Sequence, residues 1–133
     1  MGKFPKTRIL VVEDEPSLQK TVRQHLARRG FDVEAANDSQ AAIELLKRSV
    51  PDIVCLDLHL PRESGYEVCE TIRNELKLDV RIVLMGAGSS PEERAYAEEA
   101  GADRYLTKPF TMNQLDEEVD YLLDLPSKTA QRA

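Results

Sequence analysis

The sequence has few of the features that mark secreted, metal-binding or membrane proteins. Its 133 residues include no tryptophan and two cysteines, and aromatic residues make up 5%. Cys55 and Cys69 lie within apolar patterns and have no His or Cys at ligand spacing, so we expect two free thiols in the core. Every apolar run is far shorter than the roughly 20 residues that cross a bilayer, and no secretion signal is recognisable. We therefore expect a soluble, cytoplasmic protein that does not bind membranes.

Charge is unevenly distributed along the chain. The formal net charge is −6, which argues against direct binding to nucleic acid. Residues 1–50 carry nine Lys/Arg against seven Asp/Glu, whereas residues 90–124 carry three against ten. The C-terminal third of the fold should therefore present an acidic face.

Short apolar runs alternate with amphipathic segments through the whole chain. The pattern predicts strands over residues 8–12, 32–36, 53–57, 80–85 and 103–107, each followed by a helix. Proline or capping residues open most of the helices, and glycine follows two of them, as is typical of helix ends. This alternation predicts a doubly wound (βα)5 three-layer sandwich with a five-stranded parallel sheet in the order 2-1-3-4-5.

Acidic residues follow two strands that this order makes neighbours. Glu13 and Asp14 come directly after the first strand, and Asp57 ends the third. Carboxylates gathered at one sheet edge repel each other, so the arrangement requires a cation, and oxygen ligands in an open cleft favour Mg²⁺. Lys108, after the fifth strand, adds a positive charge suited to a phosphoryl group. A carboxylate nucleophile, Mg²⁺ and lysine together predict a phosphoryl-transfer site.

Three segments resemble the receiver domain of bacterial two-component response regulators. They are Val12–Pro16, Leu56–Pro61 with Gly65 behind it, and Lys108–Phe110. The similarity extends over residues 7–125, which we assign to a receiver domain, and we expect residues 126–133 to be a flexible tail or linker stub. It implies the flavodoxin-like fold already expected and a signalling protein that is not an enzyme. Such a domain catalyses only its own phosphoryl transfer and slow self-dephosphorylation.

The resemblance assigns roles to the acidic residues. Asp57 would accept a phosphoryl group from a histidine kinase or a histidine phosphotransfer protein. Asp14 and Asp57 would bind Mg²⁺ directly, the backbone carbonyl of His59 would be a further ligand, and Glu13 would act through water.

One position departs from the family's pattern. The family usually ends its fourth strand with Thr or Ser followed by Ala, and the hydroxyl binds the phosphoryl group, but this chain has Gly86 before Ala87. The backbone of both residues and Lys108 would still bind the phosphoryl oxygens, while the lost hydroxyl donor is worth about 1.5–3 kcal/mol. Tyr105 would be the aromatic switch residue, although the space beside Gly86 equally allows a ring that rests inside the fold.

Two functions are compatible with these residues. The first is a phosphoacceptor domain in a phosphorelay. The second is a pseudo-receiver, a protein-interaction module that signals without phosphorylation, and Gly86 favours it. In either case we expect a downstream, basic protein to bind the acidic face of the fourth helix, fifth strand and fifth helix. We expect a monomer or a weak dimer.

Overall fold

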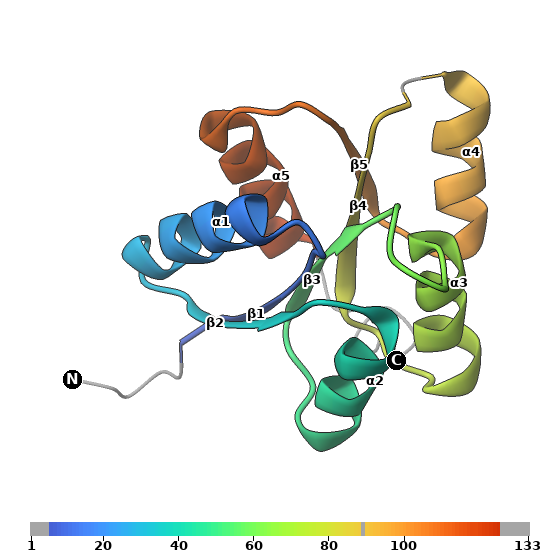
Figure 1. The fold of residues 1–133 in the computed structure, drawn as a ribbon, viewed down its shortest axis with the longest axis horizontal. Coiled ribbons are helices and arrows are strands. Elements are labelled where there is room, and N and C mark those ends of the chain that lie inside the picture. Colours follow the sequence, from blue (N-terminus) through green and yellow to red (C-terminus); the bar gives the residue numbers. More distant parts are fainter. Residues whose placement is uncertain (1–5, 89, 126–133) are drawn as a thin grey trace.

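The computed structural model describes residues 6–88 and 90–125, which form a parallel sheet between two layers of helices (Figure 1). In chain order the elements are β1 (Arg8–Val12), α1 (Pro16–Arg28), β2 (Asp32–Ala36), α2 (Ser39–Arg48), β3 (Ile53–Asp57), α3 (Gly65–Glu70), the π-helical continuation η1 (Thr71–Glu75), β4 (Arg81–Gly86), α4 (Pro91–Ala100), β5 (Arg104–Thr107) and α5 (Met112–Asp124). The sheet order is β2-β1-β3-β4-β5 with all pairs parallel, which confirms the predicted fold. The assigned bounds of the domain, 7–125, stay a prediction, and the predicted tail, 126–133, lies outside the described residues.

Local sequence explains where the helices begin. The Glu15 side chain accepts hydrogen bonds from the backbone N–H groups of Ser17 and Leu18 at the start of α1, where Pro16 occupies the first turn. Reciprocal capping boxes open α3 and α5, because a Ser or Thr hydroxyl and a Glu or Gln three residues later satisfy each other's backbone N–H groups. These caps fix the direction in which each helix leaves the sheet edge.

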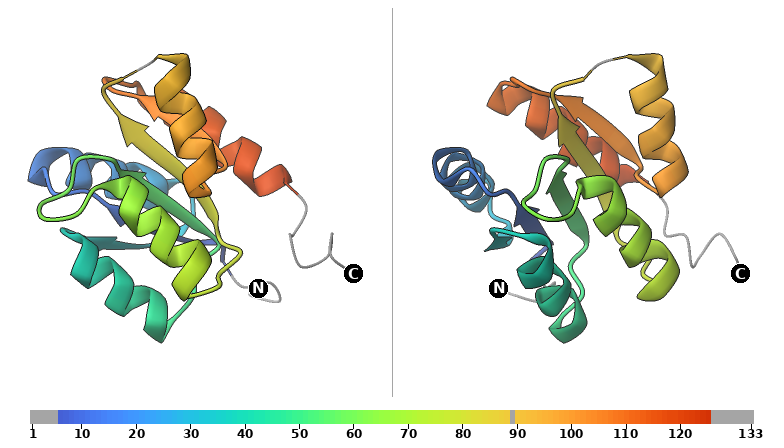
Figure 2. Two further views of the ribbon diagram at one scale, coloured as in Figure 1. Left: turned by 90° about the vertical axis from the view of Figure 1, so that its right-hand side faces the viewer. Right: turned by 45° about the vertical axis from the view of Figure 1, so that its right-hand side comes forward.

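Alternation along the strands divides the core between the two faces of the sheet. Helices α1 and α5 cover one face, and α2, α3 and α4 cover the other (Figures 1 and 2). The first face buries apolar residues of both helices: Val22, Leu26, Leu115, Val119 and Leu122. Both cysteines are buried thiols outside any disulfide, as expected from the sequence, and burial raises the pKa of Cys55 to about 12.

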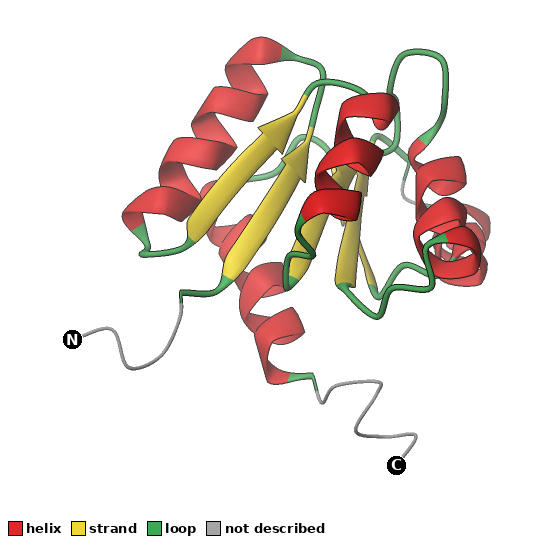
Figure 3. Ribbon diagram, turned by 90° about the horizontal axis from the view of Figure 1, so that it is seen from below, coloured by secondary structure: helices red, strands yellow, loops and turns green. Residues whose placement is uncertain are grey.

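All five strands run in the same direction, so their carboxyl ends lie at one edge of the sheet (Figure 3). The pairing register determines which residues lie side by side at that edge. Asp57 pairs with Met85 of β4, so Gly86 lies one residue further toward that edge. Strands β4 and β5 start one residue later than predicted, and β4 includes Gly86. At these strand starts the Arg73 guanidinium binds the Val80 carbonyl and the Asp103 carboxylate, and that carboxylate also accepts a hydrogen bond from the Ile82 backbone N–H.

Candidate functional site

Two buried carboxylates lie side by side where β1 and β3 end. Val12 pairs with Leu56, and the next residues along the two strands are Glu13 and Asp57. Their exposed fractions are 1% and 2%, whereas Asp14 is exposed. The chain order predicts this convergence, since neighbouring parallel strands bring their carboxyl ends to one edge.

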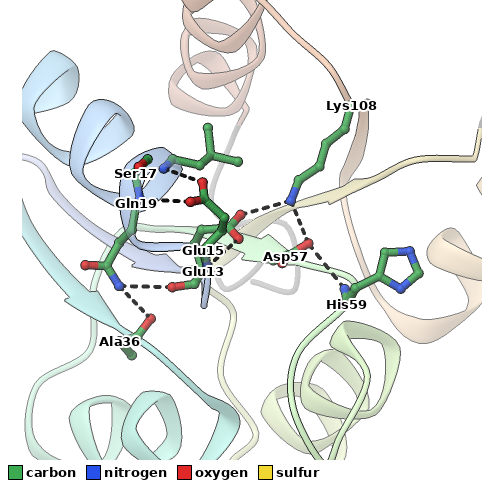
Figure 4. A network of polar contacts seen from close by, with 9 residues as sticks. Glu13, Glu15, Ser17, Gln19, Ala36, Asp57, His59 and Lys108 are labelled. Carbon is green, nitrogen blue, oxygen red and sulfur yellow. Dashed lines mark hydrogen bonds and ion pairs between the residues drawn. The ribbon is translucent and has the colours of Figure 1, made fainter.

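Lys108 connects the two buried carboxylates (Figure 4). Its Nζ lies 3.0 Å from Oε1 of Glu13 and 3.0 Å from Oδ1 of Asp57, and its side chain is 23% exposed. Burial disfavours the ammonium, but hydrogen bonds to Asp57 and Glu13 outweigh that effect, so the pKa of Lys108 is raised. The Lys108 backbone N–H donates to the Gly86 carbonyl at 2.8 Å, which fixes the start of this loop against β4.

Glu13 is held in a setting that disfavours its charge. Burial raises the pKa of Glu13, the hydrogen bond from Lys108 opposes that shift, and the nearby charge of Asp57 adds to it. The Glu15 backbone N–H donates to Glu13 Oε2 at 3.1 Å. A second cation beside these oxygens would favour the ionised form of Glu13.

The oxygen atoms of this site fit a hard divalent cation. One carboxylate oxygen from each of Glu13, Asp14 and Asp57 lies within 4.8 Å of the others. Oxygen ligands of this kind, open to solvent on the Asp14 side, suit Mg²⁺, which keeps several of its waters. The predicted metal ligands from β1 and β3 are therefore close enough to share one ion.

His59 contributes through its backbone. Its N–H donates to Oδ1 of Asp57 at 3.2 Å, and its exposed imidazole extends to the other side of the backbone from Asp57 (Figure 4). The bond orients the carboxylate toward Lys108. The predicted role of the His59 carbonyl as a metal ligand stays a prediction.

The remaining predicted residues lie around the end of β4. Gly86 is buried and ends the strand, and Ala87 is exposed beyond it. Tyr105 is 7% exposed, with its ring inside the fold on the α3–α4 side of the sheet. Its position agrees with the resting inward ring that the sequence left open, and its role as a switch stays a prediction.

Two residues that support the site were not identified as supports from the sequence. A Cβ on Gly65 would lie 2.5 Å from the backbone oxygen of Asp57, so only glycine lets α3 start this close to the site. Gln19 of α1 donates to the Glu13 carbonyl at 3.0 Å and to Ala36 at 3.3 Å, which ties the loop after β1 to β2 (Figure 4). Gly65 was part of a recognised motif, but no sequence signal indicated Gln19.

Comparison with known proteins identifies the family. The family model described as the response regulator receiver domain matches residues 9–120. The response regulator MprA of Mycobacterium leprae is 40% identical over 108 residues, which cover 81% of this chain and 47% of that protein. A probable transcriptional regulator, ycf27, of Porphyridium aerugineum is 37% identical over 118 residues, 89% of this chain and 48% of that protein. The chain thus spans about half the length of these curated relatives.

Solved structures show the same fold. The non-phosphorylated HemR receiver domain of Leptospira biflexa aligns with a TM-score of 0.83 at 30% identity, covering 91% of this chain and 97% of that one. The chemotaxis response regulator CheY4 of Vibrio cholerae aligns with a TM-score of 0.84 at 24% identity, covering 88% and 98%. The chain belongs to the response regulator receiver domain family. Within the residues described, no helix is long and apolar enough to span a membrane.

Proposed function

We propose that this chain is the phosphoacceptor of a two-component phosphorelay and that Asp57 takes the phosphoryl group from a histidine kinase or a histidine phosphotransfer protein. The observation that carries the proposal is the contact of Lys108 Nζ with the 2% exposed Asp57 carboxylate at 3.0 Å. A buried nucleophile beside a partly buried cation, at the carboxyl edge of a parallel sheet, suits transfer of an anionic group.

The transfer forms a bond between a carboxylate oxygen of Asp57 and phosphorus. The bond from phosphorus to the donor's histidine nitrogen breaks, and its electron pair stays on that nitrogen. Lys108 neutralises charge on the phosphoryl oxygens, and the backbone N–H groups at Gly86 and Ala87 are further donors. The product is a modified side chain of the protein itself, so the domain acts as a signalling element. Slow self-dephosphorylation later removes the phosphoryl group.

The proposed cofactor is Mg²⁺, which would screen the charge that builds up between the carboxylates and the phosphoryl oxygens. Asp14 and Asp57 would bind it directly, Glu13 through water, and the carbonyl of His59 would complete the protein's share. The spacing of the three carboxylates supports this assignment.

Labelling with a small phosphodonor tests the proposal. The purified chain is incubated with acetyl phosphate and Mg²⁺, and the acyl phosphate is measured by intact mass. We expect one phosphoryl group on the wild type, none on Asp57→Asn, and wild-type labelling on the control Asp124→Asn, which changes an exposed carboxylate of α5. Absence of label on the wild type in the presence of Mg²⁺ would refute the proposal.

The pseudo-receiver is the second candidate, and Gly86 supports it because the hydroxyl donor of the family is missing. If it is correct, neither the structure nor the affinity for a partner changes when a phosphate mimic binds. Amide NMR spectra of the chain with Mg²⁺, recorded with and without beryllofluoride, distinguish the two. Shifts that spread from Asp57 beyond the site favour the phosphorelay, and shifts confined to the site favour the pseudo-receiver.

We also propose that a basic downstream protein binds the acidic face formed by α4, β5 and α5, and that the chain acts in the cytoplasm as a monomer or weak dimer. Arg104 is already paired with Glu118 at 2.6 Å and lies over the Tyr121 ring at 4.3 Å, so it adds little positive charge to this face. Size measurement with and without beryllofluoride tests the oligomeric part, because a phosphate-dependent dimer would contradict it.

A further inference from the structure

The hydroxyl of Tyr105 is buried beside the end of β4 without a partner. Tyr105 pairs with Leu84 in the sheet, and its ring enters the core on the α3–α4 side. Among the residues described, no group meets hydrogen-bond geometry at its Oη, although the Gly88 backbone lies close enough to oppose the rise in its pKa. Burial raises the pKa of Tyr105, and the Glu93 carboxylate raises it further, so the hydroxyl stays neutral.

The hydroxyl occupies the space that a side chain at position 86 would need. A Cβ built on Gly86 would lie 2.6 Å from Tyr105 Oη and 2.8 Å from Leu58 Cδ2, and real Cβ atoms essentially never approach another atom within 3.0 Å. The Leu58 methyl can rotate away, but Oη is fixed to a rigid ring and can only move if the ring moves. Any side chain at position 86 therefore requires the Tyr105 ring to move from its present position.

The inward ring also shapes the surface between α4 and β5. Tyr105 lines a groove of about 190 Å³ together with Arg94, Ala97, Glu98 and Arg104. The Arg94 guanidinium carbon lies 5.6 Å from the centre of the Tyr105 ring, on the surface side. Outward rotation of the ring would place it in this groove, so the rotamer of Tyr105 decides the shape that a partner meets.

We infer that Gly86 holds Tyr105 inward whether or not Asp57 carries a phosphoryl group, so that the α4–β5 groove keeps one shape in both states. The reason is steric: with no side chain at position 86, nothing at the end of β4 competes with the hydroxyl for its place. The half of this inference that concerns the phosphorylated state rests on the proposed function. The half that concerns Gly86 and Tyr105 stands without it.

Nuclear Overhauser contacts between the Tyr105 ring and the Leu58 methyl groups report the rotamer. We would record them in the wild type with Mg²⁺, before and after addition of beryllofluoride, and expect them in both spectra. In Gly86→Ala, which adds a single methyl group, we expect these contacts to be lost. The chemical shifts of the ring should also move toward those of an exposed tyrosine. In the double variant Gly86→Ala with Tyr105→Phe the contacts should return, because the tyrosine hydroxyl is gone and the Leu58 methyl, the other atom within 3.0 Å of the new Cβ, can rotate.

Each result bears on the inference. Contacts that disappear when beryllofluoride binds to the wild type would overturn it, and so would contacts that persist in Gly86→Ala. If beryllofluoride shifts no amide signal at Asp57 or Ala87, the proposed function fails, but the comparison of Gly86→Ala with the double variant still tests the steric half. Should Gly86→Ala be unfolded, folding of the double variant with its contacts intact supports the inference, and an unfolded double variant refutes it.

Discussion

Replacing Lys108 by Met tests whether one ammonium compensates two buried carboxylates. Methionine keeps most of the apolar stem of lysine and removes the charge. Glu13 and Asp57, which are 1% and 2% exposed in the wild type, would then lose the cation that lies 3.0 Å from each. The variant should therefore be less stable than the wild type at neutral pH.

The expected loss is about 3 kcal/mol. Removing one partner of a buried ion pair costs about 3–5 kcal/mol, because the remaining charge is left uncompensated. The low end applies here because the Lys108 side chain is 23% exposed and water can reach the site through its place. The pKa of Lys108 is raised on folding, so its stabilising effect is fully present below its ordinary value of 10.5 and is lost only as the pH rises through the folded value. A measurement at pH 7 thus reports the whole effect.

Urea denaturation without divalent ions measures this loss. With an ordinary slope of about 2 kcal/mol per molar urea, the midpoint of Lys108→Met should fall by about 1.5 M relative to the wild type. Lys47→Met is the matched control, since Lys47 is exposed on α2 far from the carboxyl edge, and its midpoint should stay within about 0.3 M of the wild type.

Adding Mg²⁺ separates charge compensation from packing. An ion at 100 times its dissociation constant stabilises the folded state by about 2.7 kcal/mol, so Mg²⁺ should restore most of the loss in Lys108→Met. It should stabilise the variant more than the wild type, in which the ammonium competes with the ion. A variant as stable as the wild type without Mg²⁺ would refute the reasoning. A large loss that Mg²⁺ leaves unchanged would point to packing instead.

Three further changes test other parts of the structure. Burial raises the pKa of Glu13 on folding, so its contribution to stability is fully present below the ordinary value of 4.5 and is lost as the pH rises through the folded value. The free energy of unfolding measured in urea should therefore fall less steeply with rising pH above 4.5 in Glu13→Gln than in the wild type. Arg73→Met removes a pair with Asp103 and the donors to three backbone carbonyls, and it should lower the free energy of unfolding by about 3 kcal/mol, measured in urea. Gly65→Ala places a Cβ 2.5 Å from the Asp57 backbone oxygen and should cost about 1–3 kcal/mol of stability and slow acetyl phosphate labelling; an unchanged labelling rate would show that the start of α3 does not position the nucleophile.

Strand order and the positions of charges could be predicted because they depend on chain order and periodicity. Residues that end neighbouring parallel strands must meet at one edge, so the proximity of Glu13, Asp14 and Asp57 follows from the strand order. Helix starts were equally predictable, since a capping box depends on residues three positions apart.

Contacts between distant side chains and backbone were not predictable from one sequence. Arg73 binds the carbonyls of Leu78, Val80 and Gly101, and no residue type at these positions indicates that their backbone needs a donor. Gln19 is similar, because its amide could have faced solvent on α1 instead of the loop after β1. In each case the side-chain rotamer and the packing of another element decide the contact, and neither follows a short-range pattern.

Gly86 shows why an absent side chain is harder to interpret than a present one. The sequence indicated that a hydroxyl donor was missing and predicted weaker binding of the phosphoryl group. The structure adds a second effect, because the vacated volume is filled by a tyrosine that lies 19 positions later in the chain, with its hydroxyl 2.6 Å from where the missing Cβ would be. The two effects act on different properties. The lost donor weakens binding of the phosphoryl group at Asp57, whereas the filled volume prevents phosphorylation of Asp57 from changing the α4–β5 surface. Restoring threonine at position 86 would therefore change both at once, and only the alanine variant, which adds volume without a donor, separates them.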